Sequence, residues 1–220
     1  WQDLTQVSRF EIFKELTYSL PWLMSSLVFA HFKIYPLALP FSFIFFLAGL
    51  RQVHNAHHYA LGISRSATER AMFTLSVFML GSMHAIQFNH LRHHAHCMDE
   101  EDIEAMSARM SGWKAILVGP LFPIKLHKAA LQLARPKQLR WIQFELIANV
   151  AWVVIVFGLL NVRALKYHVI AMTVGQCLTA FFAVWTVHHD CDQSHFIART
   201  LRDKFKCAVT FNMFYHVEHH

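Results

Sequence analysis

The chain has 220 residues, of which 55% are hydrophobic and 15% are charged. It is therefore more apolar and less charged than a typical soluble domain, and its length predicts a single domain over residues 1–220. The net charge is +6 with histidine neutral. Because the basic residues flank apolar runs and form no soluble basic face, no nucleic-acid partner is expected. The four cysteines form no C-x-x-C pair, which argues against a zinc knuckle or a redox motif.

Four apolar segments are about long enough to cross a bilayer, which takes roughly 20 helical residues. They cover residues 16–32, 34–53, 141–160 and 168–187. Pro21 could kink the first. The joins within each pair are very short, so the sequence predicts two helical hairpins, since a spanning segment in lipid must satisfy its own backbone. The predicted fold class is an all-α integral membrane protein with four transmembrane helices.

Two further segments, residues 71–88 and 113–134, are apolar but interrupted by polar residues. They predict helices that lie on the membrane interface or dip into it. The acidic stretch 99–104 predicts a solvated loop or the start of a helix. Four helices buried in a soluble protein are the alternative, but short joins and scarce charge argue against it.

The basic residues are distributed unequally between the two sides of this topology. Lys33, Arg163 and Lys166 lie in the two short joins, and the other 17 of the 20 basic residues lie on the opposite side. Basic residues accumulate on the cytoplasmic side of membrane proteins. We therefore expect both termini and the long middle section to be cytoplasmic.

The 17 histidines are clustered, and the spacing H-x-x-H-H occurs three times. The clusters are "HNAHH" from His54 to His58, "HLRHHAH" from His90 to His96, the pair His188 and His189, and "HVEHH" from His216 to His220. Helical residues three and four apart share a face, so each box directs several imidazoles into one volume. Neutral imidazole suits iron, zinc, copper and nickel. Three boxes and an extra histidine are too many ligands for one ion, which favours two.

Isolated histidines are expected to be structural or solvent-facing, and this applies to His31, His127 and His168. The same reading is favoured for His84, His96 and His195, whereas His57 could be either a ligand or structural. Soluble di-iron bundles use Glu-x-x-His on inward-facing helices, and this chain has no Glu three residues before a His. The pattern therefore indicates a histidine-rich di-metal site of another class.

The order and spacing of the boxes resemble those of the membrane fatty acid desaturase and hydroxylase superfamily. The resemblance covers nearly the whole chain and rests on His54 with His58, on His90 with His93 and His94, and on His216 with His219 and His220. The wording "FNMFYHVEHH" is similar to that of bacterial members, which implies a bacterial inner membrane with the metal site on its cytoplasmic face.

The resemblance implies two iron ions held by nine histidines, with O2 as co-substrate. The ninth ligand is expected at the end of the last span, where His188 is favoured over His189. Asp192, four residues after His188, could orient it from the same helix face. The family implies a lipid or acyl substrate and a separate electron donor of the ferredoxin, rubredoxin or cytochrome b5 type.

Fatty acyl desaturation is the activity that the resemblance favours. A hydroxylase or ketolase acting on a lipid, a carotenoid or another apolar substrate is the alternative on the same scaffold. A histidine-rich membrane metal transporter or sensor is less favoured, because transporter ligands are expected near the bilayer midplane.

Overall fold

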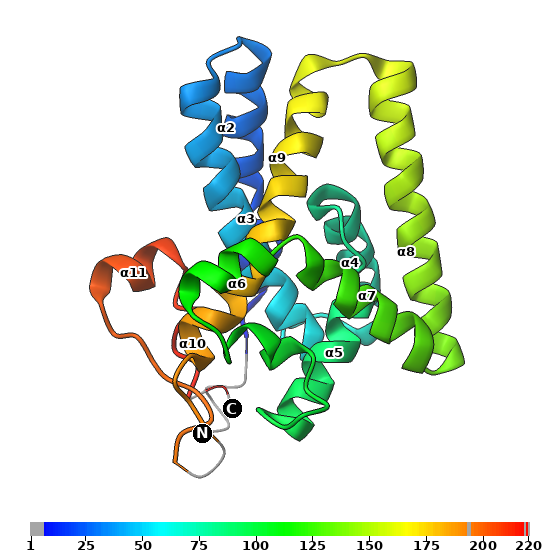
Figure 1. The fold of residues 1–220 in the computed structure, drawn as a ribbon. Helices are drawn as coiled ribbons and strands as arrows, with labels where there is room; N and C mark the ends of the chain where they lie inside the picture. The colour runs from blue at the N-terminus through cyan, green and yellow to red at the C-terminus, as the bar shows by residue number, and fades with distance from the viewer. Residues whose placement is uncertain (1–6, 193–194, 218, 220) are drawn as a thin grey trace.

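The computed structural model describes residues 7–192, 195–217 and 219, and their regular structure is helical (Figure 1). The helices are α1 (Arg9–Thr17), α2 (Leu20–His31), α3 (Tyr35–His57), α4 (Arg65–Met79), α5 (Met83–His96), a short 3-10 turn (Glu104–Ser107), α6 (Gly112–Val118), α7 (Leu121–Leu133), α8 (Pro136–Val154), α9 (Arg163–Thr179), α10 (Thr186–His188) and α11 (Lys204–Val209). A π-helical stretch, Ile155–Leu160, extends α8, and another, Ala180–Trp185, joins α9 to α10.

Three continuous helical stretches are long and apolar enough to cross a membrane. They are Tyr35–His57, Pro136–Leu160 and Arg163–His188, and they contain three of the four expected spans. A fourth span exists if α4 and α5, which meet at a bend of 110°, count as one broken span. The expected interfacial segment 71–88 falls within this bent pair.

The expected first span is not one helix. The chain breaks at Tyr18 and Ser19, and α2 has 12 residues, fewer than the roughly 20 needed to cross. Pro21 provides the physical reason, because it has no N–H to donate to the carbonyl of Thr17 four residues earlier. The proline thus ends one helix and begins another instead of merely kinking a span.

Both expected hairpins form, and their joins lie at the same end of the molecule (Figure 1). In the first hairpin, the hydroxyls of Ser26 on α2 and Ser42 on α3 are buried and lie 2.7 Å apart. The Ser42 hydroxyl also lies 3.0 Å from the hydroxyl of Tyr167 on α9, which ties the two hairpins together. The far ends of α3 and α10 therefore emerge together, away from the joins.

The start of α5 is fixed by an acidic residue from α8. Glu145 is fully buried and accepts hydrogen bonds from the Ser82 hydroxyl at 2.6 Å and from the backbone and ring nitrogens of His84 at 3.0 and 2.8 Å. A carboxylate at a helix N-terminus satisfies free N–H groups and interacts favourably with the helix dipole. This contact sets the position of α5, which carries the second histidine box.

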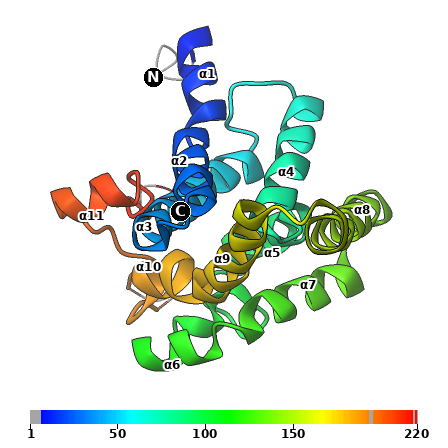
Figure 2. The ribbon, with the colours of Figure 1, turned by 90° about the horizontal axis from the view of Figure 1, so that it is seen from above.

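Viewed from above, α6 and α7 run along one side of the bundle next to α9 (Figure 2). Gly119 lies between α6 and α7, so close to α9 that a Cβ there would collide with the backbone carbonyl of Cys177. The largest apolar core lies between α3, α4 and α9, and its fully buried members include Phe45, Phe46 and Met79. The histidine boxes lie at one end of this core.

Candidate metal centre

Separate elements bring the predicted ligands to one place. His54 lies in the last turn of α3 and His58 caps it, α5 carries the second box, and α10 ends at His188. The C-terminal segment supplies His216 and His219. Eight of the nine predicted ligands thus lie in the described residues, whereas His220 lies outside them.

Five of these side chains form what we call the first histidine group: His54, His58, His90, His94 and His219. The Nε2 atom of His90 lies 3.1 Å from that of His58 and 3.2 Å from that of His94. The Nε2 atom of His219 lies 2.8 Å from that of His94. Four of these residues each have a ring nitrogen within 4.8 Å of the ring nitrogens of the other three: His54, His58, His90 and His219.

Three others form the second histidine group: His93, His188 and His216. The Nε2 atom of His188 lies 3.1 Å from that of His93 and 3.0 Å from that of His216. All three residues are buried. The two groups are neighbours, because the rings of His90 and His93 have centroids 6.1 Å apart and those of His216 and His219 have centroids 5.4 Å apart.

The rings of His93 and His188 are each hydrogen-bonded through the nitrogen that faces away from the second histidine group. The Nδ1 atom of His93 lies 2.7 Å from a carboxylate oxygen of Asp102, and that of His188 lies 2.8 Å from the carbonyl oxygen of Ile197. In the neutral rings, each Nδ1 therefore donates and each Nε2 presents a bare lone pair. Two such lone pairs 3.1 Å apart repel each other unless a proton or a metal ion lies between them.

The nitrogen spacing fits a shared metal ion. Two imidazole nitrogens about 2.1 Å from an ion and at right angles lie about 3.0 Å apart. The five Nε2–Nε2 separations given above run from 2.8 to 3.2 Å. Burial lowers the pKa of His219 to about 4, so its ring is neutral near pH 7 and can serve as a ligand.

Two carboxylates orient the second box. Asp102 is buried and bonds His93, and Glu104 has its Oε1 atom 2.9 Å from the Nδ1 atom of His90. The expectation that stretch 99–104 is a solvated loop or the start of a helix is therefore right only in part. Glu104 begins the 3-10 turn and Glu100 and Glu101 are exposed, but Asp102 is buried against His93. Such carboxylate–histidine contacts fix the tautomer and orientation of a metal-binding ring. The sequence does not reveal these contacts, because the loop brings Asp102 and Glu104 back to α5 only in the folded chain.

The two carboxylates are held in different electrostatic states. Burial raises the pKa of Asp102, but hydrogen bonds from His93 and from the backbone of Met98 and Ala105 outweigh it and leave this pKa below its ordinary value. Burial raises the pKa of Glu104 above its ordinary value. Within the part of the chain that the structure describes, the Oε2 atom of Glu104 is buried without a hydrogen-bond partner.

The structure separates His188 from His189. His188 joins the second group, whereas the ring of His189 stacks on Trp185 with centroids 4.4 Å apart and has its Nδ1 atom 3.2 Å from the carbonyl oxygen of Ala108. The expectation for Asp192 requires correction. The helix ends at His188, so the spacing of four no longer places Asp192 on its face, and Asp192 pairs with His195 at 3.2 Å.

Three of the isolated histidines have the structural contacts expected of them. His127 and His168 make structural hydrogen bonds to backbone groups, and His84 pairs with Glu145. His57, which the sequence left open, is buried with its ring centroid 5.6 Å from that of His90, and neither of its ring nitrogens has a hydrogen-bond partner among the described residues.

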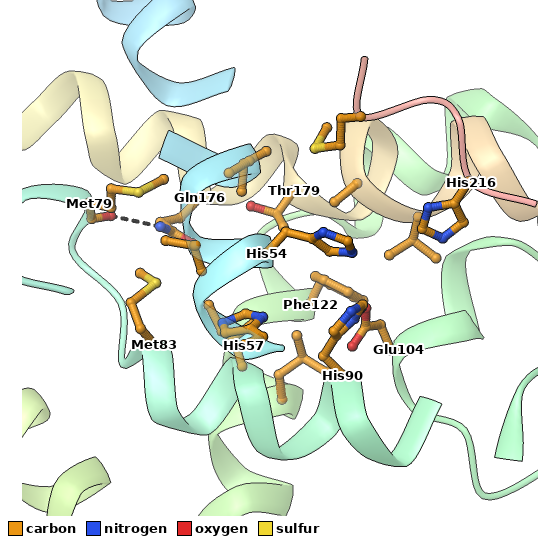
Figure 3. Close-up of a pocket in the computed structure, with 17 residues that line it drawn as sticks. His54, His57, Met79, Met83, His90, Glu104, Phe122, Gln176, Thr179 and His216 are labelled. Carbon is orange, nitrogen blue, oxygen red and sulfur yellow. Dashed lines mark hydrogen bonds and ion pairs between the residues drawn. The ribbon is translucent and has the colours of Figure 1, made fainter. Parts of the chain in front are cut away.

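A narrow apolar cavity of about 60 Å³ adjoins the histidines (Figure 3). It runs from Met79 and Gln176 at one end to Glu104 and His216 at the other, with His54 and His90 between them. A hydrogen bond of 2.7 Å from the amide of Gln176 to the carbonyl of Met79 closes the far end. The cavity therefore connects an apolar interior with both histidine groups.

A cysteine also lies beside the second group. Cys97 is buried at the end of α5, and its Sγ atom lies 3.9 Å from the Nε2 atom of His93. Donor atoms of His93, Cys97 and His188 all lie within 4.8 Å of one another. The sequence carried a signal for this, because Cys97 follows His93 by four residues at the end of α5, although it belongs to no pair of cysteines.

The family comparison agrees with this geometry. The sequence profile described as fatty acid desaturase matches residues 17–220, a range that includes all nine predicted ligands. No curated protein and no solved structure matches the chain.

Proposed function

We propose that this chain, which belongs to the fatty acid desaturase family, oxidises unactivated C–H bonds of a lipid acyl chain, most directly by desaturation. The proposal includes two iron ions, O2 as co-substrate and a separate electron donor. One observation carries it: ring nitrogens of eight histidines converge in two adjacent groups beside an apolar cavity.

The donor set fits iron. Imidazole nitrogen suits this metal, and the nitrogens are spaced as neighbouring ligands of one ion are. The first histidine group would hold one ion and the second group the other, with His220 as a further candidate ligand. A bound iron pair supplies the oxidising chemistry, in which O2, two electrons and two protons convert a –CH2–CH2– unit to a –CH=CH– unit and two waters.

The protein's own part is to hold the chain and exclude water. The cavity walls contributed by Met79, Met83 and Phe122 are apolar and offer no hydrogen bonds to water. At about 60 Å³ the cavity is smaller than an acyl chain, so a substrate has to displace side chains. Methionine suits this role, because it is unbranched and adapts its shape easily.

The placement of the ligands disfavours a transporter. His54 lies in the last turn of Tyr35–His57, and His188 is the last residue of Arg163–His188. Transport sites are expected near the middle of the bilayer, inside broken spans. A site at the helix ends, with a cavity leading inward, is instead suited to chemistry on a chain that enters from the membrane.

Product analysis tests the function and separates the two oxidations. The chain is expressed in a lipid-producing host with His54→Ala as the inactive control, and acyl lipids are analysed by mass spectrometry. Loss of two hydrogens shows desaturation, whereas gain of one oxygen shows hydroxylation. If neither product depends on His54, acyl oxidation by this centre is refuted.

A further inference from the structure

We propose that a basic pocket at the start of α8 binds the headgroup of an anionic membrane phospholipid. The pocket has a volume of about 420 Å³ and shares no residue with the apolar cavity at the histidines. We define the basic pocket by its four cations: Arg65 on α4, Arg92 on α5, and Arg135 and Lys137 at the start of α8. The inference goes beyond the proposed oxidation and does not depend on bound metal.

The basic pocket lies at the end of the bundle that carries the histidine groups. The apolar stretch Pro136–Leu160 is long enough to cross a membrane, and Figure 1 shows its start beside α5, away from the hairpin joins. On α5, Arg92 points about 160° away from His90, because neighbouring helical residues are about 100° apart. The pocket therefore lies outside the metal site, at the level where a spanning helix meets lipid headgroups.

Positive charge in the basic pocket exceeds the negative charge around it. Glu69 lies 3.7 Å from Arg65 and 4.0 Å from Lys137. The cation on α5 pairs at 3.3 Å with Glu101, whose side chain is 74% exposed. Arg135 has no ion pair within the described residues. Ion pairs this exposed and this long contribute little, so an anionic ligand can compete for the cations.

One wall of the basic pocket is apolar. Phe88 and Leu91 line it, and the guanidinium of Arg92 lies 5.9 Å from the centroid of the Phe88 ring. Two turns after Lys137, on the same face of α8, Phe144 is 55% exposed. Hydrocarbon attached to a bound phosphate can therefore lie against apolar side chains. A phospholipid uses both the cations and this wall, whereas a free phosphate uses only the cations.

The donors in the basic pocket fit a phosphodiester. Arginine presents N–H groups in a planar fork that matches phosphate oxygens, and three of the four cations are arginines. Arg135 is also the N-cap of α8 and has no side-chain oxygen to accept from the first-turn amides. A zwitterionic headgroup would bring an ammonium group close to these cations. An anionic headgroup avoids that repulsion, and basic pockets between membrane helices bind such headgroups.

The competing interpretation is a general positive surface on one side of the membrane, with no particular site. Such a surface attracts anionic lipids through its total charge, so every cation on that side contributes about equally. A built pocket instead makes the effect depend on which cation is removed. Lys114 on α6 provides the comparison, because it is exposed, lies on the same side in the expected topology and does not line the pocket.

Lipid retention by the purified full chain tests the proposal. The protein in detergent is mixed with phosphatidylglycerol or phosphatidylcholine of identical acyl chains. Native mass spectrometry measures the lipid bound per chain, and thermal unfolding measures the stabilisation. We expect phosphatidylglycerol to be retained and to raise the unfolding midpoint more than phosphatidylcholine does. Soluble glycerol phosphate should not displace it. These comparisons on the unaltered chain need no variant to fold.

Charge variants locate the site. Arg135→Gln should weaken phosphatidylglycerol binding about fivefold, and the double variant Arg65→Gln with Arg135→Gln about 25-fold, because each cation near a membrane surface contributes on this scale. Both side chains are exposed, so the variants should unfold in lipid-free detergent at the midpoint of the unaltered chain. Lys114→Gln removes the same charge outside the pocket and should leave binding unchanged.

Each outcome decides the inference separately from the proposed oxidation. Equal retention of the two lipids, or displacement by glycerol phosphate, would overturn the anionic phospholipid site. Equal weakening by Arg135→Gln and Lys114→Gln would overturn the pocket in favour of a general surface charge. Selective weakening by the pocket variants supports the site. Because lipid is measured without metal or turnover, a chain that oxidises no lipid could still show it.

Discussion

At the scale of single residues, the buried acids determine how well the second box can bind a metal. Asp102 and Glu104 each hold the outer nitrogen of a ring whose inner nitrogen faces a histidine group. Without them, the rings of His93 and His90 could rotate or adopt the other tautomer. The ligands and their orienting acids are therefore one functional unit.

Removal of either orienting acid should weaken metal binding. We expect Asp102→Asn and Glu104→Gln each to lower the affinity for one ion by roughly 10- to 100-fold, because the orientation and basicity of a ligand ring are lost. Competition with a chelator of known affinity measures this. Glu101→Gln is the matched control, since Glu101 belongs to the same acidic stretch but has a side chain that is 74% exposed. Equal affinities in all three variants would contradict the role assigned to the buried acids.

The adjacent pair His188 and His189 permits a second test at this scale. Neighbouring helical residues point about 100° apart, and only His188 faces His93 and His216. We expect His188→Ala to lose iron and activity, and His189→Ala to retain iron, because its ring contacts Trp185 instead. Iron content after purification decides. Iron lost from His189→Ala but kept by His188→Ala would show that the assignment is wrong.

At the scale of helices, the sequence predicts what depends on apolar length and on spacing. Three spans and both hairpins follow from long apolar runs, and the clustering of boxes follows from the helical repeat. The break before α2 is predictable only if Pro21 is interpreted as the boundary between two helices and not as a kink within one. The 110° bend between α4 and α5 was not predicted, and one of the contacts beside it involves Glu145, which lies more than 60 residues away in the chain.

Close approach of α6 and α7 to α9 gives a prediction for glycine. Gly119→Ala should destabilise the protein by about 1–3 kcal/mol or more, because backbone atoms of α9 cannot move aside as a flexible side chain can. Gly158→Ala is the control, since a Cβ there would meet nothing within 4 Å, and its effect should not exceed about 1 kcal/mol in either direction. Thermal unfolding in detergent compares them, and equal midpoints would refute the close approach.

At the scale of the whole molecule, the two ends of the helical bundle differ. The joins of the hairpins lie at one end, and the histidine groups, built from α3, α5, α10 and the C-terminal segment, lie toward the other (Figure 1). This separation is what the sequence pattern required, because the boxes follow the spans directly. It also means that the orientation in the membrane decides which side of the membrane the histidine groups face.

The charge asymmetry predicts that orientation. Three of the 20 basic residues lie at the joins, so the joins should face outward and the histidine groups the cytoplasm. Single cysteines are introduced at Ser66, which is exposed at the start of α4, and at Val162, which is 41% exposed between α8 and α9. Each is then treated with a membrane-impermeant maleimide. Their background replaces Cys177, Cys191 and Cys207 with alanine but keeps the buried Cys97. We expect intact cells to show labelling at Val162→Cys only, and Ser66→Cys to react after permeabilisation. Labelling of Ser66→Cys in intact cells would contradict the topology, because the histidine groups would then face away from the cytoplasm.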